Sequence, residues 1–273
     1  MTRPPDEPYF VSFGQSHPDG PLFIFLPGLD ETSLDLMRAQ TKTLEDVFDV
    51  RCLVIPPENL ENWETLSQQV VDLTKAELSQ VPRSSIYLCG ESFGGCLALK
   101  VALKAPQLFN RLVLVNPASS FNQLPWIHWG SSLTGFFPGF AYQALSIAAL
   151  PFLVPLHRVS YATCLMLMAE IASAPKESSI CRIALMREFA VSEKQLYSLA
   201  QPILLIGSEV DILLPSVAEV RRLAQILPDA QVELLPHSGH ACLLETDINL
   251  YQIMKTQRFL EPSCVMETRR GLE

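Results

Sequence analysis

The feature that most constrains the fold is the hexapeptide Gly-Glu-Ser-Phe-Gly-Gly at Gly90–Gly95. The apolar run over 85–89 before it predicts a buried strand, and the apolar run over 96–103 after it predicts a helix. A G-x-S-x-G sequence between strand and helix makes a sharp turn, flanked by glycines because a Cβ atom there would meet neighbouring backbone. The turn exposes the serine hydroxyl above a helix N-terminus that favours negative charge. Ser92 is therefore predicted as a nucleophile, and a glycine-rich turn without catalysis is the alternative.

A serine nucleophile on such a turn needs an acid and then a histidine downstream, in that order. Four histidines follow Ser92, and the first two of them follow no predicted strand. His237 and His240 lie between a strand-like and a helix-like stretch, on a loop that can reach across the strand ends. Gly239 gives this loop the freedom to turn its successor toward the serine, so His240 is the predicted general base. His237 is the competitor.

The acid is expected just beyond a strand that lies between the serine and the histidine. The continuous apolar run 202–207 predicts a parallel strand. Asp211, four residues past its end, is the predicted acid, and its role would be to hold the tautomer of His240 and stabilise the imidazolium. Glu209 is the nearest rival. The strand predicted at 111–116 ends in Asn-Pro and offers no competing carboxylate.

Acyl transfer to a serine also needs an oxyanion hole, built from two backbone N–H donors. Phe93, the residue after the nucleophile, is predicted to supply the first donor. The second is expected on the loop after the strand predicted at 21–26, and Leu29 is the predicted residue. Its neighbour Asp30 is the alternative, although Asp30 also suits the N-cap of a following helix.

The alternation of strand and helix patterns predicts an α/β fold with an open, mostly parallel, doubly wound sheet. Strands are predicted at 9–13, 21–26, 50–55, 85–90, 111–116, 202–207 and 230–235. Helices are predicted near 33–45, 63–80, 93–105, 216–227 and 243–258, with Asn62 as the N-cap of the second. The predicted organisation is a core of residues 1–118 and 199–260, an apolar helical lid of 119–198, and a polar tail of 261–273.

The predicted lid is unusually apolar, since no Asp, Glu, Lys or Arg occurs from Leu112 through His157. Prolines interrupt this stretch, so no helix of about 20 residues could span a bilayer. Many of its large side chains are expected to form the lid's own core, but so small an insertion cannot bury all of them. Some are predicted to line an acyl or prenyl tunnel or to contact a membrane surface. The predicted substrate-binding residues are Phe121, Trp126, Trp129, Phe136 and Phe137.

Four segments carry a resemblance to a known family: Leu26–Asp30, Gly90–Cys96, Val115–Phe121 and Gly239-His240. They resemble the hydrolase half of the phytyl ester synthase and diacylglycerol-acyltransferase-like family, within the α/β-hydrolase superfamily. The resemblance covers residues from about 20 to about 250. It implies an α/β-hydrolase fold with a lid inserted after the strand at 111–116, and it implies lipid or isoprenoid (phytyl-type) esters as substrates.

Longer members of that family carry a second, acyltransferase domain with an H-x4-D motif, which this sequence lacks. Hydrolysis of long-chain or isoprenoid esters through a Ser92–His240–Asp211 triad and an acyl-enzyme is therefore the prediction. Acyl transfer that makes phytyl or glycerolipid esters is the alternative.

Two other functional classes fit the sequence less well. A lyase of the menaquinone-synthesis type shares the fold but uses arginines in the lid and after the nucleophile turn, where this chain has an uncharged stretch and Cys96. A non-catalytic lipid-binding module is free to lose its triad, whereas all three members are present here.

Composition narrows the possible partners, cofactors and cellular location of the protein. The chain has 20 basic and 29 acidic residues and a net charge of −9, which disfavours nucleic acid as a partner. Seven cysteines without paired spacing indicate a reducing compartment. No cluster has metal-ligand spacing and no nucleotide motif occurs, so neither a metal nor a cofactor is expected. Residues 1–7 lack an apolar export segment. The predicted location is cytoplasmic, with contact to an internal membrane such as a photosynthetic membrane.

Overall fold

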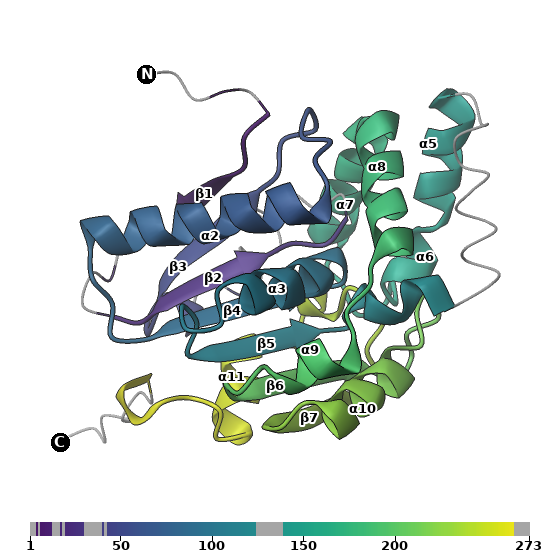
Figure 1. Cartoon of the computed structure of the whole chain (residues 1–273). Coiled ribbons are helices and arrows are strands. Elements are labelled where there is room, and N and C mark those ends of the chain that lie inside the picture. Colours follow the sequence, from purple (N-terminus) through teal and green to yellow (C-terminus); the bar gives the residue numbers. More distant parts are fainter. Residues whose placement is uncertain are drawn as a thin grey trace, which may run out of the picture.

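The computed structural model describes residues 4, 6–12, 17, 20–29, 40, 43–123 and 139–264. At its centre is a seven-stranded sheet with the order β1-β3-β2-β4-β5-β6-β7 (Figure 1). The strands are β1 Tyr9–Ser12, β2 Leu22–Leu26, β3 Asp49–Val54, β4 Ile86–Glu91, β5 Arg111–Val115, β6 Ile203–Ser208 and β7 Ala230–Leu235. Strand β1 is antiparallel to β3, and each of the other neighbouring pairs is parallel.

The chain reverses its direction of winding at β2, because β3 lies on one side of β2 and β4 on the other. In open parallel sheets, ligands bind outside the carboxyl ends of the strands at such a switch point. Ser92 directly follows β4, and Leu29 lies in the segment after β2. The topology therefore brings the predicted nucleophile and the predicted oxyanion segment to neighbouring strand ends.

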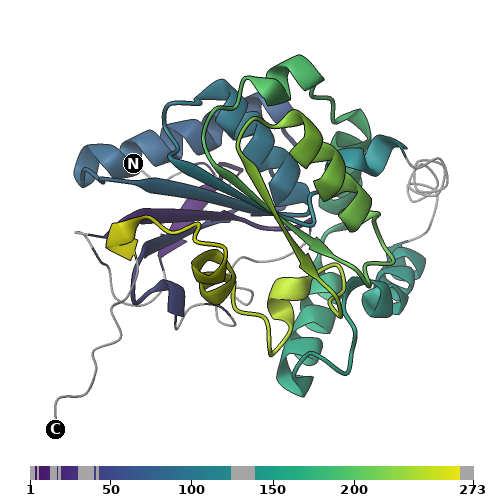
Figure 2. The same ribbon diagram turned by 90° about the horizontal axis from the view of Figure 1, so that it is seen from below.

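Helices cover both faces of the sheet (Figure 2). The α-helices are α2 Trp63–Gln80, α3 Phe93–Lys104, α5 Gly139–Ala148, α6 Leu150–Leu153, α7 Tyr161–Ser173, α8 Lys176–Glu188, α9 Glu193–Tyr197, α10 Ser216–Ile226 and α11 Leu250–Thr256. Short 3-10 turns are η1 Ala118–Gln123, η3 Cys242–Leu244 and η4 Pro262–Cys264. Buried residues of α2, α3 and α10 share one core, and buried residues of α11 share the other.

Strand β2 shows how the sheet separates these two cores. Leu22, Ile24 and Leu26 pack into the core that contains α2 and α3, whereas Phe23 and Phe25 pack into the core that contains α11. Successive side chains of a strand point to opposite faces, so a strand buried on both sides must be apolar throughout. This explains why a run without polar alternation forms the centre of the sheet.

Helix α2 occupies the residues predicted for it. The side chain of Asn62 accepts a hydrogen bond from the Thr65 N–H at 3.0 Å, which is the expected N-cap geometry. Trp63, Leu66 and Val70 are buried at helical spacing. The predicted strands and the helices at 93–105 and 216–227 agree with the structure to within about one residue at each end. Most of the helix predicted near 33–45 lies outside the described residues.

The prediction of one helix over 243–258 was wrong. The structure instead has the short turn η3 at Cys242–Leu244 and then α11 at Leu250–Thr256. Glu245 is buried in contacts with the preceding loop, and the Asn249 side chain caps α11 by accepting the Gln252 N–H at 2.9 Å. A helical pattern in sequence cannot reveal such a tertiary contact, which interrupts the helix here.

Two residues of the predicted tail contact the sheet or are buried: the Glu261 N–H donates to the Tyr87 hydroxyl at 2.9 Å, and Cys264 is only 1% exposed. Residues 265–273 lie outside the described part.

Helices α5 to α9 lie between β5 and β6 in the sequence, and α5 to α8 gather at the carboxyl ends of the parallel strands (Figure 1). They occupy the segment predicted as a lid. Among the described helices, none is both long enough and apolar enough to cross a membrane.

Candidate active site

Ser92 stands on a tight turn between β4 and α3, with a φ of 54° and a ψ of −114°. Such a conformation is strained for a residue that carries a side chain. A Cβ atom on Gly90 would lie 2.2 Å from the Gly94 carbonyl oxygen, and one on Gly94 would lie 2.0 Å from the Leu26 carbonyl oxygen. Both glycines are therefore required by close backbone packing, as the motif predicts.

The structure brings Ser92, His240 and Asp211 together. His240 Nε2 lies 2.8 Å from Ser92 Oγ, and His240 Nδ1 lies 2.7 Å from Asp211 Oδ2. The side chains of His240 and Asp211 are 4% and 0% exposed. The three residues follow the carboxyl ends of β4, β6 and β7. This geometry allows His240 to accept the serine proton while its other nitrogen donates to the carboxylate.

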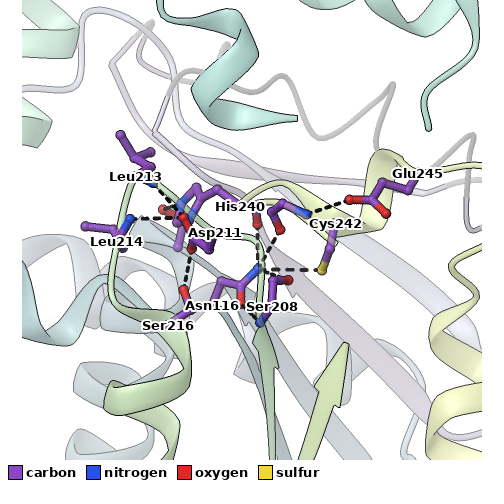
Figure 3. A network of polar contacts seen from close by, with 11 residues as sticks. Asn116, Ser208, Asp211, Leu213, Leu214, Ser216, His240, Cys242 and Glu245 are labelled. Carbon is purple, nitrogen blue, oxygen red and sulfur yellow. Dashed lines mark hydrogen bonds and ion pairs between the residues drawn. The ribbon is translucent and has the colours of Figure 1, made fainter. Parts of the chain in front are cut away.

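Asp211 is held by donors on three sides (Figure 3). The N–H groups of Leu213 and Leu214 donate to Oδ1 at 2.9 and 3.0 Å, and the Ser216 hydroxyl donates to Oδ2. Burial acts to raise the pKa of Asp211, but the hydrogen bonds and the attraction of His240 outweigh it, so this pKa lies below its usual value. The carboxylate thus stays ionised, as it must to stabilise an imidazolium.

The alternative base His237 and the alternative acid Glu209 are both exposed, unlike the buried side chains of His240 and Asp211. His237 is exposed in the turn after β7, and the structure pairs Ser92 with His240 instead. Glu209 is exposed too, and its backbone N–H bonds to the Leu235 carbonyl oxygen at 3.0 Å. Of the two histidines, it is His240 that the structure places beside Ser92, and of the two acids it is Asp211 that contacts His240.

Phe93 is the first residue of α3, and the first N–H groups of a helix have no acceptor within the helix. The Phe93 ring is fully buried and stacks on Trp63, with 4.9 Å between ring centroids. Leu29 follows β2, whose Leu26 is in register with Gly90 of β4. Both predicted donors thus lie at adjacent strand ends. Asp30, the alternative second donor, lies outside the described residues, and Leu29 stays a prediction.

Asn116 is a site residue that sequence reasoning missed. Its side-chain Nδ2 donates to the His240 carbonyl oxygen at 2.6 Å and to Ser208 Oγ at 2.8 Å, and its Oδ1 accepts the Ser208 N–H at 2.8 Å (Figure 3). Its φ of 42° is in the left-handed region that Asn tolerates better than most residues. The signal that the sequence offers for this role is the Asn-Pro pair directly after a strand, and by itself the pair indicates only that no carboxylate stands there.

Glu245 is the second missed residue. Glu245 is 1% exposed, and its carboxylate accepts hydrogen bonds from the Gly239 N–H at 2.8 Å and the Ser238 hydroxyl at 3.0 Å. Arg158, in the inserted segment, also donates to it. Glu245 therefore fixes the loop that carries His240. Ser238 and Gly239 lie six to seven residues before Glu245, a spacing that matches neither a helical nor a strand pattern, and Arg158 lies 87 residues before it.

Of the five predicted substrate-binding residues, the structure describes Phe121. Phe121 is 8% exposed and packs in the core beside α3. Trp126, Trp129, Phe136 and Phe137 lie outside the described residues. Within the described ranges, no three His, Cys, Asp or Glu side chains are placed to hold a metal ion.

Comparison with known proteins decides the family. A family model of the alpha/beta hydrolase fold matches residues 21–247. The chain belongs to the α/β-hydrolase family. This α/β-hydrolase is 31% identical over 267 residues to phytyl ester synthase 1, a chloroplastic protein of Arabidopsis thaliana, a match that covers 90% of this chain. The predicted family resemblance is thereby confirmed. The match spans only 38% of the length of that relative.

Solved structures of other proteins have a fold similar to that of this α/β-hydrolase. MenH from S. aureus superposes with a TM-score of 0.72 at 14% identity, covering 93% of this chain and 96% of that one. A thermophilic esterase from Thermogutta terrifontis superposes with a TM-score of 0.70 at 20% identity, covering 94% of each chain. At these identities the comparisons establish the shared architecture alone.

Proposed function

We propose that this α/β-hydrolase is a serine carboxylester hydrolase for long-chain or isoprenoid, phytyl-type, lipid esters. The observation that carries the proposal is the hydrogen-bonded series Ser92–His240–Asp211, with links of 2.8 and 2.7 Å, on a strained turn before a helix. A nucleophile, a base and an orienting acid in this arrangement are what ester hydrolysis requires. The likeness to phytyl ester synthase 1 supports an ester as substrate.

In the proposed reaction, Ser92 Oγ attacks the ester carbonyl carbon while His240 Nε2 takes the hydroxyl proton. The N–H groups of Phe93 and Leu29 stabilise the oxyanion. The carbon–oxygen bond to the alcohol then breaks, His240 returns the proton to the departing alcohol, and the acyl group stays on Ser92. Water attacks this acyl-enzyme and gives a proton to His240, which passes it to Ser92 Oγ as the carboxylic acid leaves. Asp211 keeps the imidazole oriented throughout.

The proposed substrate class rests on the inserted segment. Residues 139–169 contain one charged side chain, Arg158, which is bound to Glu245 and Asp247. Large apolar side chains are nonetheless exposed there, and such exposure is typical of lipid or protein contact sites. They are Leu145, Phe152, Leu156, Tyr161 and Leu165. We therefore include contact with a neutral lipid surface in the proposal, which suits a protein that works beside an internal membrane.

Acyl transfer is the second candidate. The same acyl-enzyme would react with an alcohol such as phytol in place of water, and the name of the relative phytyl ester synthase 1 favours this possibility. The lyase alternative has weaker support, because the likeness to MenH is one of fold at 14% identity.

The substrate class is tested with p-nitrophenyl esters of increasing acyl length, assayed without detergent and below the micelle threshold, with Ser92→Ala as the background control. If an apolar channel binds the acyl chain, kcat/KM should rise from C2 to at least about C8, each CH₂ contributing up to ~0.8 kcal/mol. A flat or falling profile beyond C4 would remove the lipid-ester proposal and leave short-chain esterase activity. Phytyl ester formed when phytol is added would establish acyl transfer.

A further inference from the structure

Helix α8 of the inserted segment reaches the loops at the strand ends through Arg182. One terminal nitrogen, Nη1, donates to the Leu29 carbonyl oxygen, and the other, Nη2, donates to the Ile55 carbonyl oxygen at 2.9 Å. Arg182 is only 8% exposed. Leu29 and Ile55 follow the neighbouring strands β2 and β3. A planar guanidinium with donors in fixed directions is suited to holding two carbonyl groups at once.

The same helix also reaches the other side of the candidate oxyanion hole. The Leu185 carbonyl oxygen accepts a hydrogen bond from Trp63 Nε1 at 2.7 Å. The Trp63 ring in turn stacks on Phe93 at 4.9 Å and meets Phe189 edge-on at 5.6 Å. Positions 182 and 185 are three residues apart, so they lie on one side of α8. One turn of this helix therefore contacts both Leu29 and, through Trp63, Phe93.

We propose that α8 positions the oxyanion hole and that Arg182 is the positioning residue for Leu29. This inference rests on the proposed function, since the oxyanion roles of the Leu29 and Phe93 N–H groups belong to it. The two peptide planes that meet at the Cα of Leu29 carry its N–H and its carbonyl. Anchoring the carbonyl limits rotation about this Cα and so keeps the N–H aimed in one direction. Oxyanion donors must be preorganised in this way, because a misplaced donor stabilises the transition state poorly.

A structural consequence is that the segment predicted to cover the substrate also sets the catalytic geometry. Helix α8 lies between β5 and β6, in the inserted part of the chain, while Leu29 and Phe93 belong to the sheet domain. The oxyanion donors would be correctly placed only while α8 is docked. Loss of that docking should therefore lower the rate of acylation before it changes how tightly a small ester binds.

The test compares Arg182→Gln and Arg182→Lys with Arg51→Gln as the matched control. Arg51 is similarly buried, 9% exposed, but its partners are Asp49 and Glu77 and not the active-site loops. The readouts are kcat and KM for a short soluble ester, the rate at which a fluorophosphonate labels Ser92, and thermal unfolding. The phosphonyl oxygen of the probe needs the same N–H donors, so labelling reports on the hole.

We expect Arg182→Gln to lower kcat and the labelling rate by about 10- to 100-fold while KM stays within about twofold. Arg182→Lys keeps a donor for one carbonyl and should recover part of the loss. Arg51→Gln should lower the unfolding temperature yet keep kcat within about twofold of wild type. Trp63→Phe, which removes the bond to Leu185 and keeps an aromatic ring, should lower kcat several-fold at unchanged KM.

The inference is overturned if Arg182→Gln, compared at equal folded fraction, loses no more kcat than Arg51→Gln. Should Arg182→Gln fail to fold, Arg182→Lys decides, and a kcat and labelling rate equal to wild type overturn the inference. A wild-type protein that neither hydrolyses esters nor labels at Ser92 would overturn the proposed function together with this inference. A labelled wild type with unaffected Arg182 variants would overturn the inference alone.

Discussion

The side-chain amide of Asn116 donates a hydrogen bond to the carbonyl oxygen of His240 at 2.6 Å. The same amide binds the backbone and hydroxyl of Ser208 at the end of β6, each at 2.8 Å. One buried side chain after β5 thus connects the strand that leads to Asp211 with the loop that carries His240. The distance between base and acid depends on this link as well as on the two residues themselves.

Replacing Asn116 should therefore impair catalysis from outside the triad. Asn116→Ala removes the amide and places alanine at a φ of 42°, so we expect a loss of ~1–3 kcal/mol in the free energy of unfolding and a kcat lower by about tenfold or more. Asn116→Gly accepts that φ without strain and should be the more stable variant, with a similar loss of kcat. Chemical unfolding and steady-state kinetics on both variants check this. Wild-type kcat in both would contradict the positioning role.

The strain at Ser92 predicts an unusual order of stability. Glycine normally makes a folded protein less stable than alanine does, because it gains more freedom on unfolding. At a φ of 54° alanine retains the strain and glycine does not, so Ser92→Gly should exceed Ser92→Ala in free energy of unfolding by about 1 kcal/mol. Urea unfolding of the two inactive variants measures this difference directly. An alanine variant that is the more stable would indicate that the turn is unstrained.

The lowered pKa of Asp211 predicts how stability responds to acid. An unfolded Asp titrates at about pH 3.9, and the pKa of Asp211 in the folded state lies below this, so the unfolded chain binds the proton more readily. The stabilisation is fully present above about pH 4 and is lost as the pH falls through the folded-state value. Asp211→Asn should therefore lose less stability than wild type between about pH 6 and about pH 3. Glu209→Gln, which removes an exposed carboxylate, is the control and should follow wild type. If wild type and both variants lost equal free energy of unfolding over this pH range, the lowered pKa of Asp211 would be contradicted.

Replacing the histidine or the acid that belongs to the triad should lower kcat more than replacing its rival. His240→Ala should lower kcat on the order of 10³-fold or more, since base and nucleophile act as a unit. His237→Ala, at an exposed position, should lose at least about tenfold less. Asp211→Asn should likewise cost more than Glu209→Gln. Steady-state kinetics with one ester ranks the four variants, and a reversed order in either pair would mean that the loop contacts differ from those described.

Local sequence rules predicted the parts of this protein that depend on neighbouring residues. The turn around Ser92 follows from glycines that no Cβ atom could replace, and α2 follows from the Asn62 cap and the spacing of its buried residues. The order of acid and histidine after the serine narrowed the acid to Asp211 or Glu209 and the histidine to His237 or His240, and Gly239 favoured His240.

Tertiary partners explain what the sequence could not predict. Glu245 looks like an ordinary helical residue until the fold brings Gly239, Ser238 and Arg158 against it. The predicted helix over 243–258 fails at that point for the same reason. The bonds of Asn116 to Ser208 and His240, and that of Arg158 to Glu245, join residues about 90 or more positions apart and leave no periodic trace in the sequence.

The most direct test is the turnover of a p-nitrophenyl ester by Ser92→Ala beside wild type, with circular dichroism to show that both are folded. A serine hydrolase mechanism predicts that the variant loses activity by a factor on the order of 10³ or more. It also predicts that a fluorophosphonate adds its mass to wild type at Ser92 and leaves the variant unmodified. Near-wild-type turnover by a folded, pure Ser92→Ala preparation would contradict the proposed mechanism.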